Sequence, residues 1–145
     1  MQKVIPFMWF DGRAREAAEF YTEIFNSAAP SSEGGGISFE VGGIRINAFD
    51  GGPEFNFNEA ISLFVSCQDQ AEVDYYWGRL TAGGEESQCG WLKDRFGVSW
   101  QIVPTALGRL LGDPDRQRAD RALQAMLKMK KLDVAALEAA ADAAD

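Results

Sequence analysis

Two hydrophobic periodicities alternate along the first fifty residues of the chain. An aromatic and branched run at Val4 to Phe10 stops at a glycine-containing turn, which predicts a strand. From Arg13 to Phe25 the apolar residues recur every three or four positions, as on one face of an amphipathic helix. Apolar and polar residues then alternate on both sides of Gly42-Gly43, which predicts a hairpin of two strands ending at Phe49.

The same order of elements begins again near residue 60. Residues 60–67 alternate as a strand, in which Ile61, Leu63 and Val65 point to one face and Ser62, Phe64 and Ser66 to the other. Asp69 with Glu72 resembles a capping box and predicts the start of a helix that ends at Gly83-Gly84. Two further strands are expected near residues 86–92 and 98–103.

The two halves match each other with a shift of about 55 residues. EFYTEIF at 19–25 aligns with DYYWGRL at 74–80, and GIRINAF at 43–49 aligns with GVSWQIV at 97–103. Two short amphipathic patterns can align by chance, but the shared order of elements favours an internal repeat. In the second alignment Asn47 falls on Gln101.

The last forty residues differ in kind from both halves. Asp113-Pro114 predicts a helix start, because proline is favoured at the first helical position. An apolar stripe follows at helical spacing, and an alanine-rich end predicts a short or frayed helix. We expect the stripe to pack on the body of the protein or on a second subunit. Its members are Ala119, Ala122, Leu123, Met126 and Leu127.

Composition narrows the classes of partner. The chain of 145 residues has 22 acidic and 14 basic side chains, and its net charge of -8 would repel both a phosphate backbone and an anionic membrane. We therefore expect no nucleic-acid and no membrane partner. Cys67 and Cys89 are too few for a disulfide framework and are interpreted as buried thiols, which favours a cytoplasmic location.

Catalytic chemistry is poorly represented in the sequence. The chain contains no histidine, which excludes histidine-based serine catalysis and leaves both thiols without their usual activating base. No glycine-rich nucleotide loop follows a strand. Asp50 and Glu59 are the candidate carboxylates for acid or base chemistry, and no catalytic residue is assigned.

Four stretches resemble one known family. MWFDGRAREAAEFYTEIF, GGPEFNFNEAISLFVSC, QCGWLKDRFGVSWQIVP and AMLKMKKLDVAALEAA are similar to the PhnB-like branch of the vicinal oxygen chelate superfamily. The resemblance implies an α+β fold of two tandem βαβββ modules that form a curled mixed sheet around a cavity, plus C-terminal helices. It implies a glyoxalase-like domain at 1–104, with modules at about 1–50 and 58–104, and a helical extension at 105–145. The stretch from 26 to 36 is short for the family, so the second strand of the first module is expected to be stunted.

The resemblance also implies a metal position on the first and last strands of each module. Gln101 stands where the metal-binding enzymes usually carry glutamate, and Asn47 is its counterpart in the repeat. The positions on the first strands are expected near Ile5 and Ala60. Two amides and two apolar side chains hold divalent cations poorly, so we expect neither a metal nor another cofactor.

Strand alternation gives the candidate ligand-binding residues. It places Gln101 toward the cavity and Trp100 and Ile102 under a helix. If the first strand is shifted by one residue, its aromatic side chains enter the core instead. Gln101 can also be a structural amide, and Arg45 can lie at a strand end in water. The candidates are Gln101, Asn47, Arg45, Ser62, Phe64, Phe7 and Trp9.

The functional hypothesis is a PhnB-like protein that binds a small organic molecule in a metal-free cavity. The superfamily commonly assembles such cavities across a dimer, so a homodimer is expected. The sequence leaves open whether a reaction follows. The alternative is an enzyme, either a metal-independent lyase or isomerase or the demethylubiquinone methyltransferase of the family label.

Overall fold

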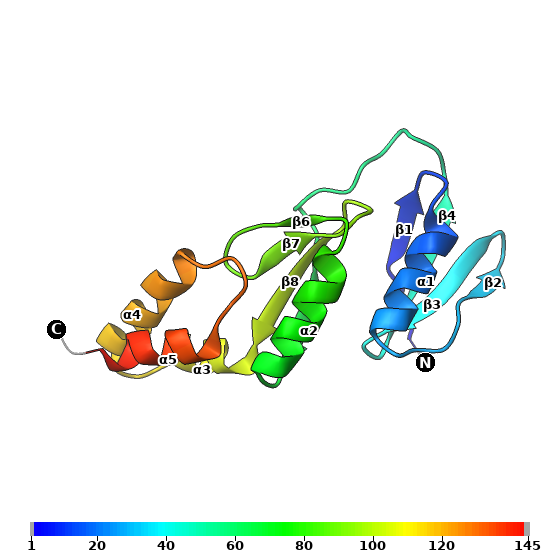
Figure 1. Cartoon of the computed structure of the whole chain (residues 1–145). Coiled ribbons are helices and arrows are strands. Elements are labelled where there is room, and N and C mark those ends of the chain that lie inside the picture. Colours follow the sequence, from blue (N-terminus) through cyan, green and yellow to red (C-terminus); the bar gives the residue numbers. More distant parts are fainter. Residues whose placement is uncertain (1, 144–145) are drawn as a thin grey trace. The chain divides into compact units, whose positions relative to one another are not determined.

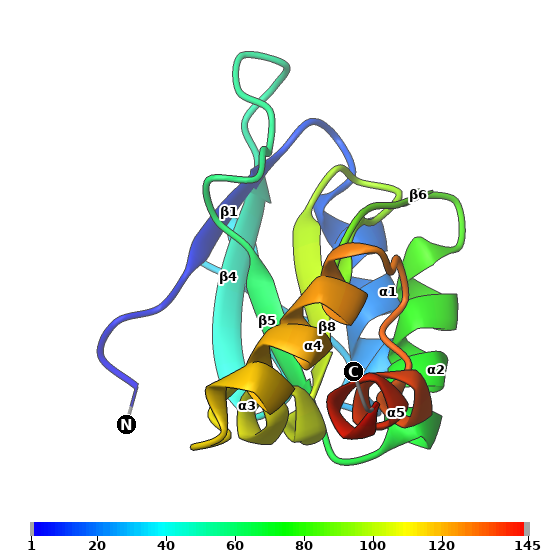
Figure 2. The ribbon, with the colours of Figure 1, turned by 90° about the vertical axis from the view of Figure 1, so that its left-hand side faces the viewer.

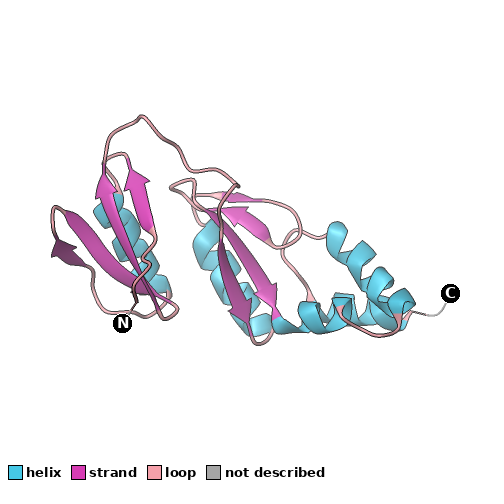
Figure 3. Ribbon diagram, turned by 180° about the vertical axis from the view of Figure 1, so that it is seen from behind, coloured by secondary structure: helices cyan, strands magenta, loops and turns pink. Residues whose placement is uncertain are grey.

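The computed structural model describes residues 2–143. Along the chain it divides into two compact units, with the boundary between Phe57 and Asn58 (Figure 1). Each unit contains one four-stranded mixed sheet, and α1 and α2 each lie on one face of their own sheet (Figure 3). The α+β class and the open mixed sheets agree with the prediction. Within the described residues none of the helices combines the length and the apolar character that a membrane span needs.

The first unit has the sheet order β1-β4-β3-β2, with β1 parallel to β4 and the other pairs antiparallel. Helix α1 contacts β3 and β4 and buries Tyr21 and Ile24, and Tyr21 packs beside the Phe39 ring of β3. β2 has only three residues, which confirms the expected short strand. The elements are β1 (Phe7–Phe10), α1 (Ala14–Ile24), β2 (Ser31–Glu33), β3 (Gly36–Val41) and β4 (Ile44–Asp50).

The second unit repeats this topology as β5-β8-β7-β6, again with its first strand parallel to its last. The identical strand order confirms the internal repeat. The side chain of Asp69 caps α2 by accepting from the Glu72 N–H at 3.0 Å, as the capping-box pattern predicted. The elements are β5 (Leu63–Cys67), α2 (Gln70–Thr81), β6 (Glu85–Glu86), β7 (Trp91–Lys93) and β8 (Ser99–Pro104).

Several strands are shorter than their hydrophobic runs. β1 begins at Phe7 because Pro6 has no N–H to contribute to the ladder, although its carbonyl still accepts from the Asn47 N–H at 2.9 Å. The strand expected at 86–92 is broken into β6 and β7 by a turn in which Cys89 and Gly90 both have positive φ. The alternation of side chains within the remaining strands is as predicted.

The tail forms a three-helix extension of the second unit (Figure 2). Its helices are α3 (Thr105–Leu111), α4 (Arg116–Leu127) and α5 (Val134–Asp142). Asp115, rather than Asp113, caps α4 by accepting from the N–H groups of residues 117 and 118, so the expected start was placed too early. The extension has its own small core of buried residues, namely Leu107, Leu110, Ala122, Leu132, Leu137 and Ala141.

Candidate functional site

The site is built on the face of the second sheet opposite α2. On β8, Trp100 and Ile102 are fully buried on the helix side, whereas Gln101 and Val103 are half-buried on the other face. This confirms the predicted alternation. We call the face that carries Gln101 the open face of the second sheet.

Three of the predicted ligand-binding residues meet on this face. Gln101 Nε2 donates to Ser62 Oγ at 2.9 Å, and Gln101 lies between Phe64 of β5 and Trp91 of β7 in the ladder. The Phe64 side chain is 59% exposed, which is high for a phenylalanine on a sheet. The sequence thus identified the centre of this face, but it did not single out Trp91.

A hollow of about 490 Å³ lies beside Gln101, a volume that suits a small organic ligand. None of its lining side chains is acidic or basic. The sheet contributes Phe64, Ser66, Trp91, Gln101, Val103 and Pro104, the turn before β7 contributes Cys89, and the extension contributes Thr105, Leu107, Gly108, Leu111 and Met126. We call this the amide hollow.

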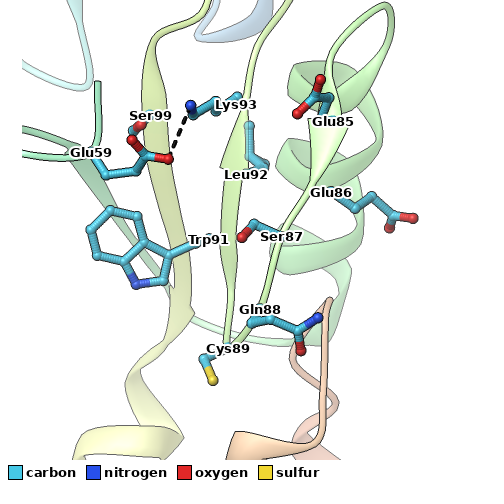
Figure 4. A pocket seen from close by; sticks show the side chains of 10 residues that line it. All are labelled: Glu59, Glu85, Glu86, Ser87, Gln88, Cys89, Trp91, Leu92, Lys93 and Ser99. Carbon is cyan, nitrogen blue, oxygen red and sulfur yellow. Dashed lines mark ion pairs between the residues drawn. The ribbon is translucent and has the colours of Figure 1, made fainter. Parts of the chain in front are cut away.

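A second hollow of about 470 Å³ lies farther along the same face (Figure 4). Lys93 Nζ and a Glu59 carboxylate oxygen are 3.0 Å apart there, and this hydrogen-bonded pair holds the pKa of Glu59 below its usual range. Glu59 is therefore ionised at neutral pH and poorly suited to donate a proton. Cys89 and Trp91 line both hollows.

The second carboxylate that the sequence suggested also has a structural partner. Asp50 Oδ1 accepts from the Ala14 N–H at 2.9 Å, so this side chain satisfies the start of α1. The spacing of 36 residues hides this contact from sequence patterns.

The two thiols differ more than expected. Cys67 is fully buried, and desolvation raises the pKa of its thiol to about 11, so it is protonated at neutral pH. Cys89 is only half-buried, which corrects the expectation of two buried thiols. The cause is its place in the turn before β7, at φ 59°, where it borders both hollows.

The open face of the first sheet carries the other predicted residues. Arg45 and Asn47 alternate along β4 with Ile46 and Ala48, which α1 covers. Arg45 Nε donates to Ser38 Oγ at 2.7 Å, and its guanidinium is ion-paired with Glu33. Within residues 2–143, Asn47 Oδ1 is buried and has no hydrogen-bond partner.

Phe7 and Trp9 lie on this same open face. The ladder pairs Phe7 with Asn47 and Trp9 with Phe49, which settles the register of the first strand in favour of the open face. The centroid of the Trp9 ring lies 4.9 Å from the ring centroids of both Phe49 and Phe55, and both pairs pack edge to face. A Cβ at Gly51 would overlap the Trp9 ring, so this position needs glycine.

The donor set at the positions implied for a metal does not fit a divalent cation. The ladders place Phe7 beside Asn47 and Phe64 beside Gln101, whereas Ile5 and Ala60 lie outside the strands. The first strands are offset by 57 residues, from 7 to 64, and not by 55. Among residues 2–143 no cluster of three His, Cys, Asp or Glu side chains could hold a metal ion. Amides and phenyl rings offer neither charge nor strong ligation, so these positions would hold a divalent cation poorly.

Comparison with known proteins gives consistent matches. The model of a family described as 3-demethylubiquinone-9 3-methyltransferase matches residues 2–103. No curated protein matches the chain. A PhnB protein from Bacillus cereus is 29% identical, with a TM-score of 0.64 over 72% of this chain and 100% of the other.

Two more distant structures share the fold alone. A protein from Pseudomonas aeruginosa is 22% identical, with a TM-score of 0.59 over 72% of this chain and 98% of the other. A fosfomycin resistance protein from Mesorhizobium loti is 15% identical, with a TM-score of 0.54 over 76% of this chain and 99% of the other.

Proposed function

The chain belongs to the family described as 3-demethylubiquinone-9 3-methyltransferase, in the PhnB-like branch of the vicinal oxygen chelate superfamily, and from this premise we propose that it binds a small organic molecule in the amide hollow without a metal ion. The observation that carries the proposal is the hollow itself. It is concave, largely apolar and centred on one amide at the position where the superfamily's metal enzymes carry a ligand.

The hydrogen bonding of Gln101 supports a role in binding. Its Nε2 donates to Ser62 Oγ, and within residues 2–143 its Oε1 has no hydrogen-bond partner. A glutamine side chain has two donors and an acceptor oxygen, so this amide retains capacity for a ligand. Phe64 and Trp91 flank it with ring surface.

Binding is better supported than turnover. Asp50 and Glu59 are engaged in a helix start and an ion pair, and Cys67 is protonated at neutral pH. The methyltransferase description belongs to the family model, and the lining of the amide hollow offers no Asp, Glu, Lys or Arg side chain for acid or base chemistry. We therefore propose binding, with catalysis as the alternative.

We propose that this protein is a cytoplasmic homodimer with neither a nucleic-acid nor a membrane partner. The net charge of -8 supports the absence of both partners, because it would repel a phosphate backbone and an anionic membrane. Exposed apolar side chains on the open faces, such as Phe7 and Phe64, support association of two copies. Sedimentation analysis should give twice the chain mass of 15.9 kDa, and a monomer at micromolar concentration would contradict this part.

The binding claim is tested by thermal shift against a collection of small metabolites. We expect at least one compound to stabilise the protein and to lose its effect in Gln101→Ala. Gln124→Ala, an exposed amide on α4, is the matched control and should behave as wild type. A compound whose stabilisation survives Gln101→Ala would show that the ligand binds elsewhere.

A further inference from the structure

One wall of the amide hollow comes from the extension, beyond the residues 2–103 that the family model matches. The match ends at residue 103, and α3 begins at Thr105. Leu107, Gly108 and Leu111 of α3, with Met126 of α4, close the hollow on that side. This wall is largely apolar.

The wall is held firmly against the second unit. The N–H groups of Cys89 and Gly90 donate to the carbonyls of Met129 and Lys130 at 2.8 Å each. The Gln70 side chain on α2 donates to the Leu132 carbonyl at 3.0 Å and accepts from the Val134 N–H at 2.7 Å. Because several bonds and a buried core fix the extension, α3 presents a defined surface to the hollow.

The lining contains no Asp, Glu, Lys or Arg side chain, in contrast to the neighbouring hollow with Glu59 and Lys93. A charged group placed in the amide hollow would lose water without gaining a counter-ion, which is costly. The polar side-chain groups of the lining are the Gln101 amide, the Trp91 indole N–H, the Cys89 thiol and the hydroxyls of Ser66 and Thr105, and none of them is a carboxylate, an amine or a guanidinium. The hollow therefore favours a neutral molecule with few polar groups.

We infer that the ligand is uncharged and carries a ring or chain that packs on α3 and Met126, with a hydroxyl or N–H that donates to Gln101 Oε1. The inference rests on the proposed function and adds the class of ligand to it. Gly108 lines the hollow. A Cβ there would meet no atom within 4 Å, so a side chain at this position has open space beside the hollow.

The test uses isothermal titration of the full chain with three naphthalenes of similar size. 2-Naphthol is neutral at pH 7, naphthalene-2-carboxylate is an anion and 2-naphthylmethylammonium is a cation. We expect 2-naphthol to bind at least about tenfold more tightly than either charged probe, because a buried charge has no partner here. Gly108→Leu should weaken 2-naphthol by at least about tenfold, because the added side chain takes its place.

The matched control is Gly78→Leu. Gly78 is an exposed helical glycine on α2, also with no atom within 4 Å of a Cβ, and it lines neither hollow. Its substitution should leave 2-naphthol binding within about twofold of wild type, because no hollow changes. If Gly108→Leu does not fold, Gly108→Ala, which favours the helix, should still weaken binding by about threefold.

The outcomes separate the inference from the proposed function. If a charged probe binds more tightly than 2-naphthol and its binding is lost in Gln101→Ala, the inferred class of ligand is wrong, whereas the amide hollow is still the binding site. Binding of 2-naphthol that is unchanged by substitution at Gly108 would overturn the role of the extension. If none of the three probes binds, the inference fails, whereas the proposed function fails only if the metabolites also give no Gln101-dependent stabilisation.

Discussion

At the scale of single residues, the least expected feature is Asp94, a carboxylate that is only 3% exposed in the turn between β7 and β8. Its Oδ1 accepts from the N–H groups of Phe96 and Val98 at 2.8 and 3.0 Å, and its Oδ2 accepts from Trp100 Nε1 at 2.9 Å. This one side chain therefore shapes the turn that leads into the strand of Gln101.

Asp94→Ala should lower the free energy of unfolding by about 3 kcal/mol, because the buried donors of Val98 and Trp100 and the partly buried N–H of Phe96 would lose their acceptor. Urea denaturation measures this loss. Asp94→Asn keeps one acceptor oxygen and should cost less, and Asp120→Ala on the exposed side of α4 should be nearly neutral. A loss below about 1 kcal/mol for Asp94→Ala would mean that the turn forms without this carboxylate.

The two cysteines should react differently with iodoacetamide at pH 8. Cys67 is buried with a pKa of about 11 and should not react in the folded protein, whereas the half-buried Cys89 should. Mass spectrometry should find one alkylated thiol in buffer and two in urea. Alkylation of a folded Cys89→Ser variant would contradict the burial of Cys67.

The buried thiol of Cys67 should make the stability of the protein depend on pH. Burial raises the pKa of Cys67 from 9.0 to about 11, so between these values the unfolded chain loses a proton that the folded chain keeps. The contribution of this thiol to the free energy of unfolding is thus fully present below about pH 9 and is lost as the pH rises toward 11. Urea midpoints of wild type should fall faster over this range than those of Cys67→Ala, and equal slopes would contradict the shift.

At the scale of elements, the order of helices and strands followed from hydrophobic period, while several ends did not. Pro6 delays β1, and the turn at Cys89 and Gly90 splits the third strand, because local backbone geometry overrides the apolar pattern. The sequence did not identify Asp115 as the N-cap of α4, because Asp113-Pro114 offered an equally good signal. Asp113 instead accepts from the Asp115 N–H and pairs with Arg118, which lowers its pKa.

The attachment of α5 to α2 belongs to this scale as well. Gln70→Ala removes both side-chain hydrogen bonds to the 132–134 segment and should lower the free energy of unfolding by about 1 to 2 kcal/mol. Amide exchange within α5 should accelerate more than exchange in α1. Gln117→Ala, an exposed amide on α4, serves as control. Unchanged exchange in α5 would show that the apolar core alone holds the extension.

At the scale of the whole molecule, the internal repeat and the family resemblance predicted both sheets and the faces on which Gln101 and Asn47 lie. Two features were out of reach, because each depends on contacts distant in sequence: the uncharged lining of the amide hollow and the contribution of α3. The pairing of Arg45 with Ser38 and Glu33 is closer in sequence, but strand alternation does not reveal it. Strand alternation assigns a side chain to one face of a sheet, but it does not identify the residues that lie against that face.

The most direct test of the account is the affinity of EDTA-dialysed protein for 2-naphthol, measured before and after addition of Mn²⁺. Because neither the pair of Asn47 and Phe7 in the first sheet nor the pair of Gln101 and Phe64 in the second offers a charged or strong metal ligand, binding should be the same within about twofold under both conditions. Binding that appears only after Mn²⁺ is added would contradict the claim that this protein recognises its ligand without a metal ion.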